Sequence, residues 1–390
     1  MYQITGDDAK ELWYPEHWVD ERQNIWYIIF MNSRSFITTK EELESILVLS
    51  DSESRWFSMQ HRPLPLRISR YYLDLIDPEN PDDPLRRQVV PSADEAVVET
   101  GVHLDPLAEV RHSVLPRLIH RYENRVAFLL TDRCATYCRH CFRRRFTAGG
   151  GAGVSDDELT KVLAYIEQHT EIREMLLTGG DPLMLSDTRL EHVLSALRAV
   201  RSDLVLRLCT RMPATYPFRV TDALVAMLAE NTNPALYLMT QFNHVREITP
   251  ESIDAVSKFV DSGIPVMNQT VLLRGVNDDV QSLEQLMNRL VSIRVKPYYL
   301  FQGDLVGGTH HLRVPLEHGL DLERQLRRRL SGLAMPTYAI DLPDGGGKVP
   351  LGSSYLHGLD ASGAWEFFTV DGETRRYPDP EQVETDRDAR

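Results

Sequence analysis

Short apolar runs that alternate with amphipathic helical segments dominate the sequence from about residue 126 onward. Runs of this length, separated by helices, are typical of βα units, in which the strands are parallel and covered by helices. A sixfold alternation predicts an α/β fold built as a (β/α)6 barrel or partial barrel. In such folds the chemistry lies at the carboxyl ends of the strands. The six runs are Val126–Thr131, Glu174–Thr178, Leu204–Thr210, Ala235–Phe242, Val266–Leu273 and Val295–Phe301.

Two helices between these runs carry clear start signals. The segment Ser155–Glu158 has the Ser-x-x-Glu pattern of a capping box. Thr249 followed by Pro250 predicts an N-cap with proline at the first helical position. Gly263 is then expected to end the second helix.

The chain divides into three parts on this pattern. Residues 1–110 are rich in Trp, Tyr and charge, and we expect a mostly helical region followed by an extended connection. The prolines of Asp77–Pro84 exclude both helix and strand there. Residues 111–335 form the predicted partial barrel. Residues 336–390 form a C-terminal segment, in which a strand-like run leads into glycines and a charged tail.

Composition narrows the class of protein. The net charge of −14 and the pI near 5.4 argue against generic nucleic-acid binding, which usually leaves a basic footprint. No stretch approaches the roughly 18 apolar residues that a membrane helix needs. The N-terminus lacks a basic region followed by an apolar one, so no secretory signal is visible. We expect a cytoplasmic protein with no membrane partner.

Three of the four cysteines lie together, and Cys209 stands apart as an expected core thiol. Cys134, Cys138 and Cys141 have the spacing C-x3-C-x2-C and follow the first barrel strand. Thiolates hold iron–sulfur clusters, and three ligands leave one iron of a four-iron cluster open to a small molecule. The alternatives are three unrelated buried thiols or a zinc site, although His140 is crowded between two cysteines and poorly placed as a fourth zinc ligand.

A lysine after three glycines is the second candidate. Lys348 follows Gly345–Gly347, and glycine allows backbone to approach a ligand closely. A phosphate-binding loop is excluded, because Leu342 and Val349 stand where that motif needs Gly and Ser or Thr. The segment is either a surface turn or carries a lysine that forms a Schiff base with pyridoxal phosphate.

With both elements in this order, the chain resembles the lysine 2,3-aminomutase family of radical S-adenosylmethionine (SAM) enzymes. The resemblance implies that the open iron anchors SAM and that Lys348 binds pyridoxal phosphate. It also implies that Gly179-Gly180-Asp181, after the second strand, lies beside the methionyl amine. The matching segments are Tyr71–Pro78, Cys141–Arg145, Gln241–His244, Asn268–Asn277 and Lys296–Leu300.

The resemblance assigns three residues to the substrate. Asp304 and Asp341 match the carboxylates that receive the distal ammonium of lysine, since a buried cation needs paired counter-charge. Arg143 matches the arginine that binds the substrate α-carboxylate with its planar fork. Each Asp could instead be a strand-end or surface residue, and Arg143–Arg145 could be a solvated basic patch. Glutamate-specific relatives lack the acidic pair.

Further residues are matched to the cofactors. Arg121, Tyr122 and Arg125 correspond to residues that hold pyridoxal phosphate, by bidentate pairing with phosphate and by ring packing. Gln269 and its neighbour Asn268 are expected to face the cofactors.

The implied activity is interconversion of L-α-lysine and L-β-lysine. An external one-electron donor reduces the cluster, cleaved SAM yields a radical that takes hydrogen from the substrate β-carbon, and the amino group moves from Cα to Cβ. The alternatives are a related mutase acting on arginine or on lysine for translation-factor modification, and, more distantly, a zinc-binding interaction protein. Clostridial members carry C-terminal cysteines that bind zinc between subunits; this tail has none, so we expect a homo-oligomer without that zinc site.

Overall fold

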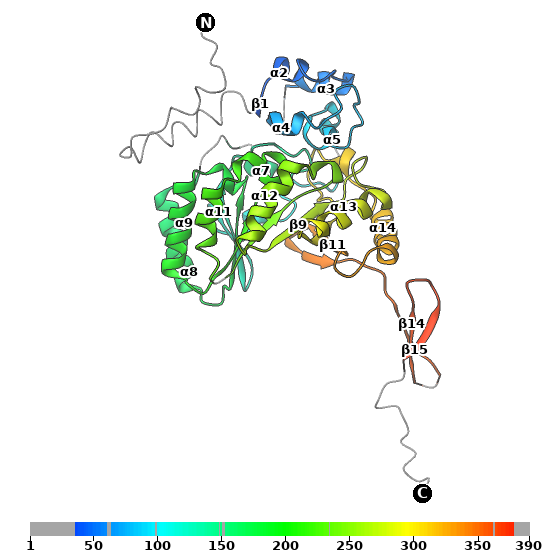
Figure 1. The fold of residues 1–390 in the computed structure, drawn as a ribbon. Coiled ribbons are helices and arrows are strands. Elements are labelled where there is room, and N and C mark those ends of the chain that lie inside the picture. The colour runs from blue at the N-terminus through cyan, green and yellow to red at the C-terminus, as the bar shows by residue number, and fades with distance from the viewer. Residues whose placement is uncertain are drawn as a thin grey trace.

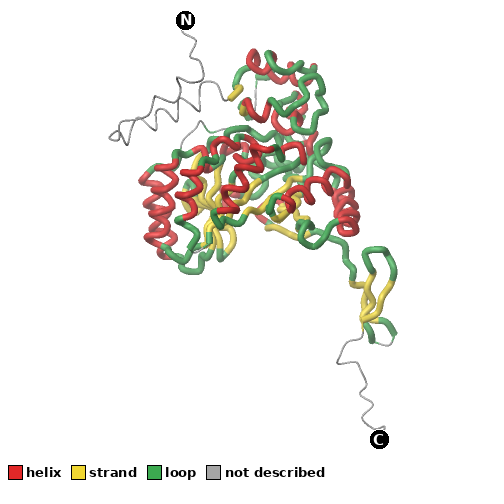
Figure 2. The backbone as a smooth tube through the Cα atoms, viewed as in Figure 1, coloured by secondary structure: helices red, strands yellow, loops and turns green. Residues whose placement is uncertain are grey.

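A ten-stranded sheet forms the centre of the molecule (Figures 1 and 2). The computed structural model describes residues 36–60, 64–97, 100–147, 149, 153–233, 235–361 and 363–377. Neighbouring strands in the order β5-β6-β7-β8-β9-β10-β11 pair in parallel, and antiparallel strands extend both edges. The strands are β3 (Ser113–Leu115), β4 (Leu118–Tyr122), β5 (Arg125–Thr131), β6 (Glu174–Gly179), β7 (Val205–Cys209), β8 (Leu236–Thr240), β9 (Val266–Val271), β10 (Lys296–Phe301), β11 (Thr337–Leu342) and β12 (Gly347–Pro350).

One long helix follows each of the strands β5 to β10 and covers the outer face of the sheet (Figure 1). These helices are α8 (Asp156–Gln168), α9 (Asp187–Val200), α11 (Asp222–Ala229), α12 (Pro250–Asp261), α13 (Val280–Ser292) and α14 (Leu316–Arg329). The short helices are α2 (Lys40–Glu44), α3 (Asp51–Phe57), α4 (Arg70–Leu73), α5 (Arg86–Val89), α6 (Glu109–His112), α7 (Arg144–Thr147) and α10 (Met212–Thr215).

The six strands predicted from apolar runs are all present, and the predicted α/β partial barrel is confirmed. The capping box at the start of α8 is complete, with Ser155 and Glu158 each bonded to the other's backbone. Thr249 caps α12 with Pro250 in the first turn. The C-cap itself is Ser262, and Gly263 follows it with φ +84°, the left-handed conformation expected just beyond a helix.

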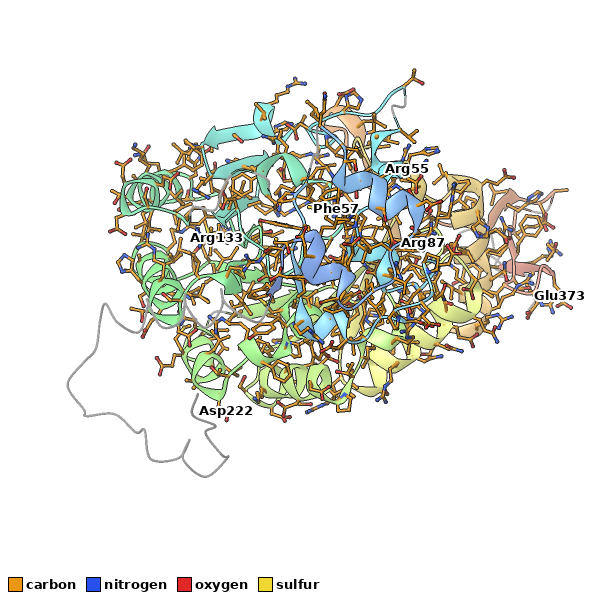
Figure 3. All side chains as sticks on the ribbon, turned by 90° about the horizontal axis from the view of Figure 1, so that it is seen from above. Arg55, Phe57, Arg87, Arg133, Asp222 and Glu373 are labelled. Carbon is orange, nitrogen blue, oxygen red and sulfur yellow. The ribbon has the colours of Figure 1, made fainter. Side chains whose placement is uncertain are left out.

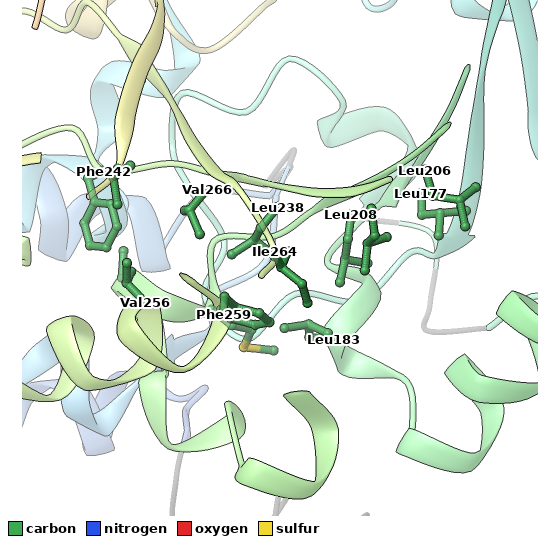
Figure 4. Close-up of a cluster of buried hydrophobic side chains, with 14 of the residues drawn as sticks. Leu177, Leu183, Leu206, Leu208, Leu238, Phe242, Val256, Phe259, Ile264 and Val266 are labelled. Carbon is green, nitrogen blue, oxygen red and sulfur yellow. The ribbon is translucent and has the colours of Figure 1, made fainter. Parts of the chain in front are cut away.

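The main core lies between the sheet and these helices (Figure 4). Strand residues such as Leu208 and Leu238 are buried in the same cluster as Phe259 of α12. Each fully buried side chain of this size contributes roughly 1.5–3 kcal/mol of transfer free energy. The opposite, inner face is different, because half-buried polar and aromatic residues alternate with these core residues along the strands. The inner face can therefore line a site.

A small helical unit covers the barrel at the end where the cysteine loop lies. It contains α2 to α5 and a two-stranded sheet, β1 (Phe36–Ile37) with β2 (Ile68–Ser69), around a core of its own. Seen from above (Figure 3), Arg55 and Phe57 of α3 and Arg87 of α5 lie over the barrel. The part of the predicted helical region that precedes Phe36 lies outside the described residues.

The C-terminal segment leaves the barrel. Strands β13 (Leu356–Leu359), β14 (Trp365–Phe368) and β15 (Thr374–Tyr377) form a separate antiparallel sheet that stands away from the body in Figure 1. The predicted charged tail lies largely outside the described residues. Within the part of the chain that the structure describes, no helix has both the length and the apolar character to span a membrane.

Candidate active site

The cysteine loop follows β5 and is held by the helical unit above it. Cys134, Cys138 and Cys141 are unpaired thiols, each partly buried. Burial, followed by neighbouring charges that include the other two thiols, raises the pKa of Cys134 well above its ordinary value. Between the second and third cysteines, Arg139 is fully buried and donates from Nε and Nη2 to the Glu95 carboxylate at 2.7 and 2.6 Å. This buried ion pair fixes the loop on the unit that carries Glu95.

Arg211, after β7, contacts the loop from inside. Its Nη1 donates to Cys138 Sγ at 2.7 Å, and its Nη2 donates to Glu247 Oε1 at 2.6 Å and to Gln88 Oε1 at 2.5 Å. Tyr72 donates to the same Glu247 oxygen at 2.6 Å. The guanidinium thus places a positive charge directly against the Cys138 sulfur, a contact that the sequence did not reveal because it joins segments far apart in the chain.

The Gly-Gly-Asp turn after β6 touches the same loop. A side chain at Gly180 would put its Cβ 2.2 Å from the Arg133 carbonyl oxygen, so only glycine fits there. Gly179 has φ +123°, which favours glycine as well. The Asp181 carboxylate accepts hydrogen bonds from Thr210 Oγ1 at 2.7 Å and from the Arg211 backbone at 2.8 Å. Asp181 therefore joins the ends of β6 and β7 beneath the cysteine loop.

Arg143 extends from the end of the cysteine loop into the barrel. Its Nη1 donates to Thr178 Oγ1 on β6 at 3.1 Å, and its Nη2 donates to Glu109 Oε1 at 2.6 Å. Burial lowers the pKa of Arg143, but Glu109 more than offsets this, so the pKa is raised overall. Arg143 belongs to this enclosed site and not to a solvated basic patch.

Lys348 lies beside Asp341 and within the electrostatic reach of Asp304. Lys348 and Asp341 are paired across the β11–β12 hairpin, and the Lys348 ammonium lies 3.5 Å from Asp341 Oδ2. The same ammonium lies 4.2 Å from the centre of the Phe301 ring and 4.7 Å from that of Tyr299. Burial lowers the pKa of Lys348, although Asp341 opposes the change. Burial, and then the charge of Asp341, raises the pKa of Asp304 to about 7.

The glycine-rich turn brings this lysine inward. Gly345 and Gly347 have positive φ, and so does Asp344 at +56°, a non-glycine residue in a conformation that favours glycine. A Cβ at Gly345 would lie 2.8 Å from His112 Nε2, so the turn packs closely against α6.

Arg121, Tyr122 and Arg125 lie at the other end of β5 from the cysteines, in the β4–β5 hairpin. Tyr122 Oη accepts a hydrogen bond from the Lys348 backbone at 3.0 Å, and Arg125 stacks on the Tyr122 ring at 3.8 Å. Arg121 Nη1 lies 3.8 Å from Asp341 Oδ1. These contacts join β4 to β11 and β12, which lie near opposite edges of the sheet, so the sheet curves around one interior.

Gln269 and Asn268 cannot share a face, because side chains alternate along β9. Gln269 is half-buried on the inner face. Asn268 is fully buried and bonded through its amide to the Phe242 backbone, with distances of 2.7 and 3.0 Å. Asn268 supports a loop instead of facing the interior. Cys209 is half-buried at the end of β7, within the electrostatic reach of Arg143 and Lys348.

Comparisons with known proteins show which family the chain belongs to. A family model described as the radical SAM superfamily matches residues 128–289, and one described as lysine-2,3-aminomutase matches residues 323–389. The L-lysine 2,3-aminomutase of Bacillus subtilis is 41% identical over 87% of this chain and 72% of its own length. That of Clostridium subterminale is 42% identical over 83% of this chain and 77% of its own. The chain belongs to the lysine 2,3-aminomutase family of radical SAM enzymes.

This family is wider than one substrate. The glutamate 2,3-aminomutase of Clostridioides difficile is 39% identical over 82% of this chain and 75% of its own length. Among solved structures, a radical SAM methyltransferase from Sphaerobacter thermophilus matches with a TM-score of 0.42 and 17% identity, over 57% of this chain and 68% of that one. As a member of the aminomutase family the chain is an isomerase, and the family implies an iron–sulfur cluster and SAM.

Two site residues of this family member were not foreseen from the sequence. Glu109 reaches Arg143 from the connection between the helical unit and the barrel, and Arg211 reaches Cys138 from β7. Neither stands in a motif with recognisable spacing. Arg211 directly follows the predicted strand Leu204–Thr210, which is a weak signal, and Glu109 lies near no predicted strand.

Proposed function

We propose that this aminomutase interconverts L-α-lysine and L-β-lysine, with pyridoxal phosphate bound to Lys348 and SAM bound to a four-iron cluster. One observation carries the proposal: Asp341 pairs with Lys348, and Asp304 lies within the electrostatic reach of Asp341, Lys348 and Arg143, the arginine that projects inward from the cysteine loop. A substrate with an α-carboxylate at one end and an ammonium at the other matches this separation of charge.

The three thiols suit a cluster better than a single metal ion. Among the described residues, no three His, Cys, Asp or Glu side chains converge closely enough to hold one ion. A four-iron cluster binds each thiolate to a different iron and does not need such convergence, whereas a zinc module does. Cys134, Cys138 and Cys141 would hold the cluster, and Arg211 would stabilise the charge on Cys138.

The surroundings of Lys348 suit pyridoxal phosphate. Arg121 has two buried nitrogens, Nε and Nη2, that find no acceptor among the described residues. A phosphate would satisfy both, because guanidinium and phosphate pair bidentately. The adjacent Gly347 keeps this space open, since even an added Cβ would lie 3.7 Å from Arg121 Nη2 and from Tyr122 Oη. Arg121 and Tyr122 would hold the cofactor, with Arg125 stacked behind the Tyr122 ring.

Each of these residues would have a separate role in the reaction. When bound, the reduced cluster with SAM supplies the radical, and pyridoxal phosphate supplies the carbonyl that carries the migrating amino group. Burial lowers the pKa of Lys348, so a larger fraction of its amine is neutral and able to bond to that carbonyl. Asp304 and Asp341 fix the distal ammonium and Arg143 fixes the carboxylate, so that the β-carbon between them is held in one position.

The charge of the side chain distinguishes lysine from glutamate as a substrate. A carboxylate tail would meet the two aspartates at the position of the lysine ammonium, so a glutamate-type substrate is disfavoured. Arginine, and lysine destined for a translation factor, share the cationic tail and remain the alternatives within the family.

Product analysis tests the proposal. Protein reconstituted anaerobically with iron and sulfide is incubated with SAM, pyridoxal phosphate, dithionite and separate samples of lysine, arginine, glutamate and alanine. We expect β-lysine from lysine alone, identified by mass and chromatography. A β-amino acid from arginine or glutamate, with none from lysine, would contradict the proposal. Zinc without iron in the purified protein would favour the interaction module.

A further inference from the structure

Arg143 makes more hydrogen bonds within the protein than the binding of a substrate carboxylate by one arginine requires. Arg143 Nε lies 3.1 Å from both oxygens of Glu109, and Nη2 lies 2.6 Å from Oε1, so the carboxylate meets the side of the guanidinium. On the other nitrogen, Nη1 donates to Thr178 Oγ1 at 3.1 Å and to the Gly179 carbonyl at 3.4 Å. Glu109 itself is only 7% exposed.

Two N–H donors of Arg143 are left for a further ligand. A guanidinium carries five N–H groups. Glu109 takes the Nε hydrogen and one Nη2 hydrogen, while Thr178 and Gly179 take those of Nη1. One Nη2 hydrogen finds no acceptor among the described residues, and one Nη1 hydrogen has only the long bond to Gly179. These two are the donors that a further carboxylate can use.

Glu109 also compensates the positive charge of Arg143 before a substrate binds. Without it, the Arg143 cation would meet, among the described residues, only the neutral oxygens of Thr178 and Gly179, and an unpaired buried charge is strongly unfavourable. With it, the guanidinium can remain in place before any substrate arrives. A pre-positioned donor binds more tightly than one that must first be ordered.

The backbone around Glu109 holds it firmly. Ala108 has φ +52°, a left-handed conformation that is uncommon for a non-glycine residue. The Asp105 carboxylate accepts hydrogen bonds from the backbone of Glu109 at 3.0 Å and of Val110 at 2.8 Å. Nearby, the His103 backbone donates to the Leu305 carbonyl at 2.9 Å, so this connection runs beside the loop that carries Asp304.

We propose that Glu109 is a positioning residue: it fixes Arg143 side-on, so that the remaining Nη hydrogens meet the α-carboxylate of the amino-acid substrate. The inference rests on the proposed function of Arg143 as the carboxylate site, but not on the identity of the substrate's tail. Glu109 touches neither the substrate nor a reacting atom, and it acts through the arginine.

Equilibrium binding of a carboxylate and its neutral amide tests this role. The loaded enzyme is titrated without reductant, so that no turnover occurs, with L-lysine and with L-lysinamide, and binding is followed by the absorbance of the bound cofactor. Glu109→Gln should weaken lysine binding at least tenfold and lysinamide binding less than twofold. Glu109→Asp should recover part of the loss. The matched control is Glu158→Gln, which removes another Glu–Arg pair (3.0 Å, to Arg117) outside the site and should change neither ligand.

The binding measurements distinguish a positioning role of Glu109 from a purely structural role and from competition for Arg143. Equal weakening of both ligands by Glu109→Gln would mean that Glu109 has only a structural role and would overturn the inference. Tighter lysine binding in the variant would overturn it too, because Glu109 would then compete for Arg143. Should Glu109→Gln fail to fold, the same carboxylate–amide comparison in Glu109→Asp decides. If the wild-type enzyme binds arginine or glutamate instead of lysine, the lysine proposal fails, but that amino acid and its α-amide still test Glu109.

Discussion

Asp304 offers a prediction in which stability and binding move in opposite directions. Burial first, and then the charge of Asp341, raises its pKa from 3.8 to about 7, and Lys348 only partly opposes this. In the folded protein without substrate, the ionised form of this carboxylate is therefore unfavourable and lowers the free energy of unfolding. Asp304→Asn removes the charge and keeps the shape.

The size and sign of the effect follow from linkage. The pKa of Asp304 is higher in the folded protein than in the unfolded chain. Its contribution to the free energy of unfolding is therefore complete below about pH 4 and is lost as the pH rises to about 7. The slope is about 1.4 kcal/mol per pH unit, or at most about 4 kcal/mol over the whole interval. Since part of this side chain reaches solvent, roughly 2–4 kcal/mol is expected. Asp304→Asn should thus be more stable than wild type, and the difference should grow from pH 5 to pH 8.

Thermal unfolding of protein prepared without pyridoxal phosphate measures this difference. Between pH 5 and pH 8 the stability gap should widen by roughly 1–3 kcal/mol, which corresponds to a few degrees in the midpoint for a domain of this size. Asp222→Asn, at a side chain that is 90% exposed on α11, serves as the control and should show no such trend. A gap that stays constant with pH, or a less stable variant, would refute the assignment of a buried charge to Asp304.

The same variant should bind lysine poorly. Removing one partner of a buried charge pair costs on the order of 2–5 kcal/mol. In the double variant, Asp304→Asn with Asp341→Asn, we expect the free energy of lysine binding to be weaker by at least this amount. Normal lysine turnover in the double variant would show that these carboxylates do not receive the ammonium.

Two further predictions concern the cofactor residues. Lys348→Ala should abolish the absorbance of lysine-bound pyridoxal phosphate and leave the iron content unchanged; an unaltered spectrum would reject Lys348 as the attachment point. Gly180→Ala should lower the iron content after reconstitution, because its Cβ would lie 2.2 Å from the Arg133 carbonyl and displace the cysteine loop. Gly307→Ala, where an added Cβ meets nothing within 4 Å, is the control. Full iron loading of Gly180→Ala would contradict the close approach.

Local patterns in the sequence were sufficient for much of the fold. The six apolar runs and the caps at Ser155 and Thr249 depend on neighbouring residues, and each predicted element is present. Asp341 and Lys348 both belong to segments with family motifs, but the sequence alone does not predict that these two residues pair. The structure places them opposite each other because a tight turn reverses the chain between them.

Contacts between distant segments could not be predicted in this way. Glu109 meets Arg143 only because the connection after the helical unit runs beside the loop that follows β10. Arg211 meets Cys138 because the sheet curves and brings the end of β7 below the cysteine loop. Asn268 was expected to face the cofactors, but strand alternation and its bonds to Phe242 turn it outward.

The central claim is that the cofactor sites at the cysteine loop and at Lys348 act together on the β-carbon of one bound substrate. The most direct measurement uses L-lysine with deuterium at its β-carbon, incubated anaerobically with the reconstituted enzyme, SAM, pyridoxal phosphate and dithionite. We expect β-lysine that carries deuterium at the α-carbon, and deuterium in the 5′-deoxyadenosyl group of recovered SAM. β-Lysine that forms with no deuterium in SAM, or with deuterium lost to water, would contradict hydrogen transfer between the two cofactor sites.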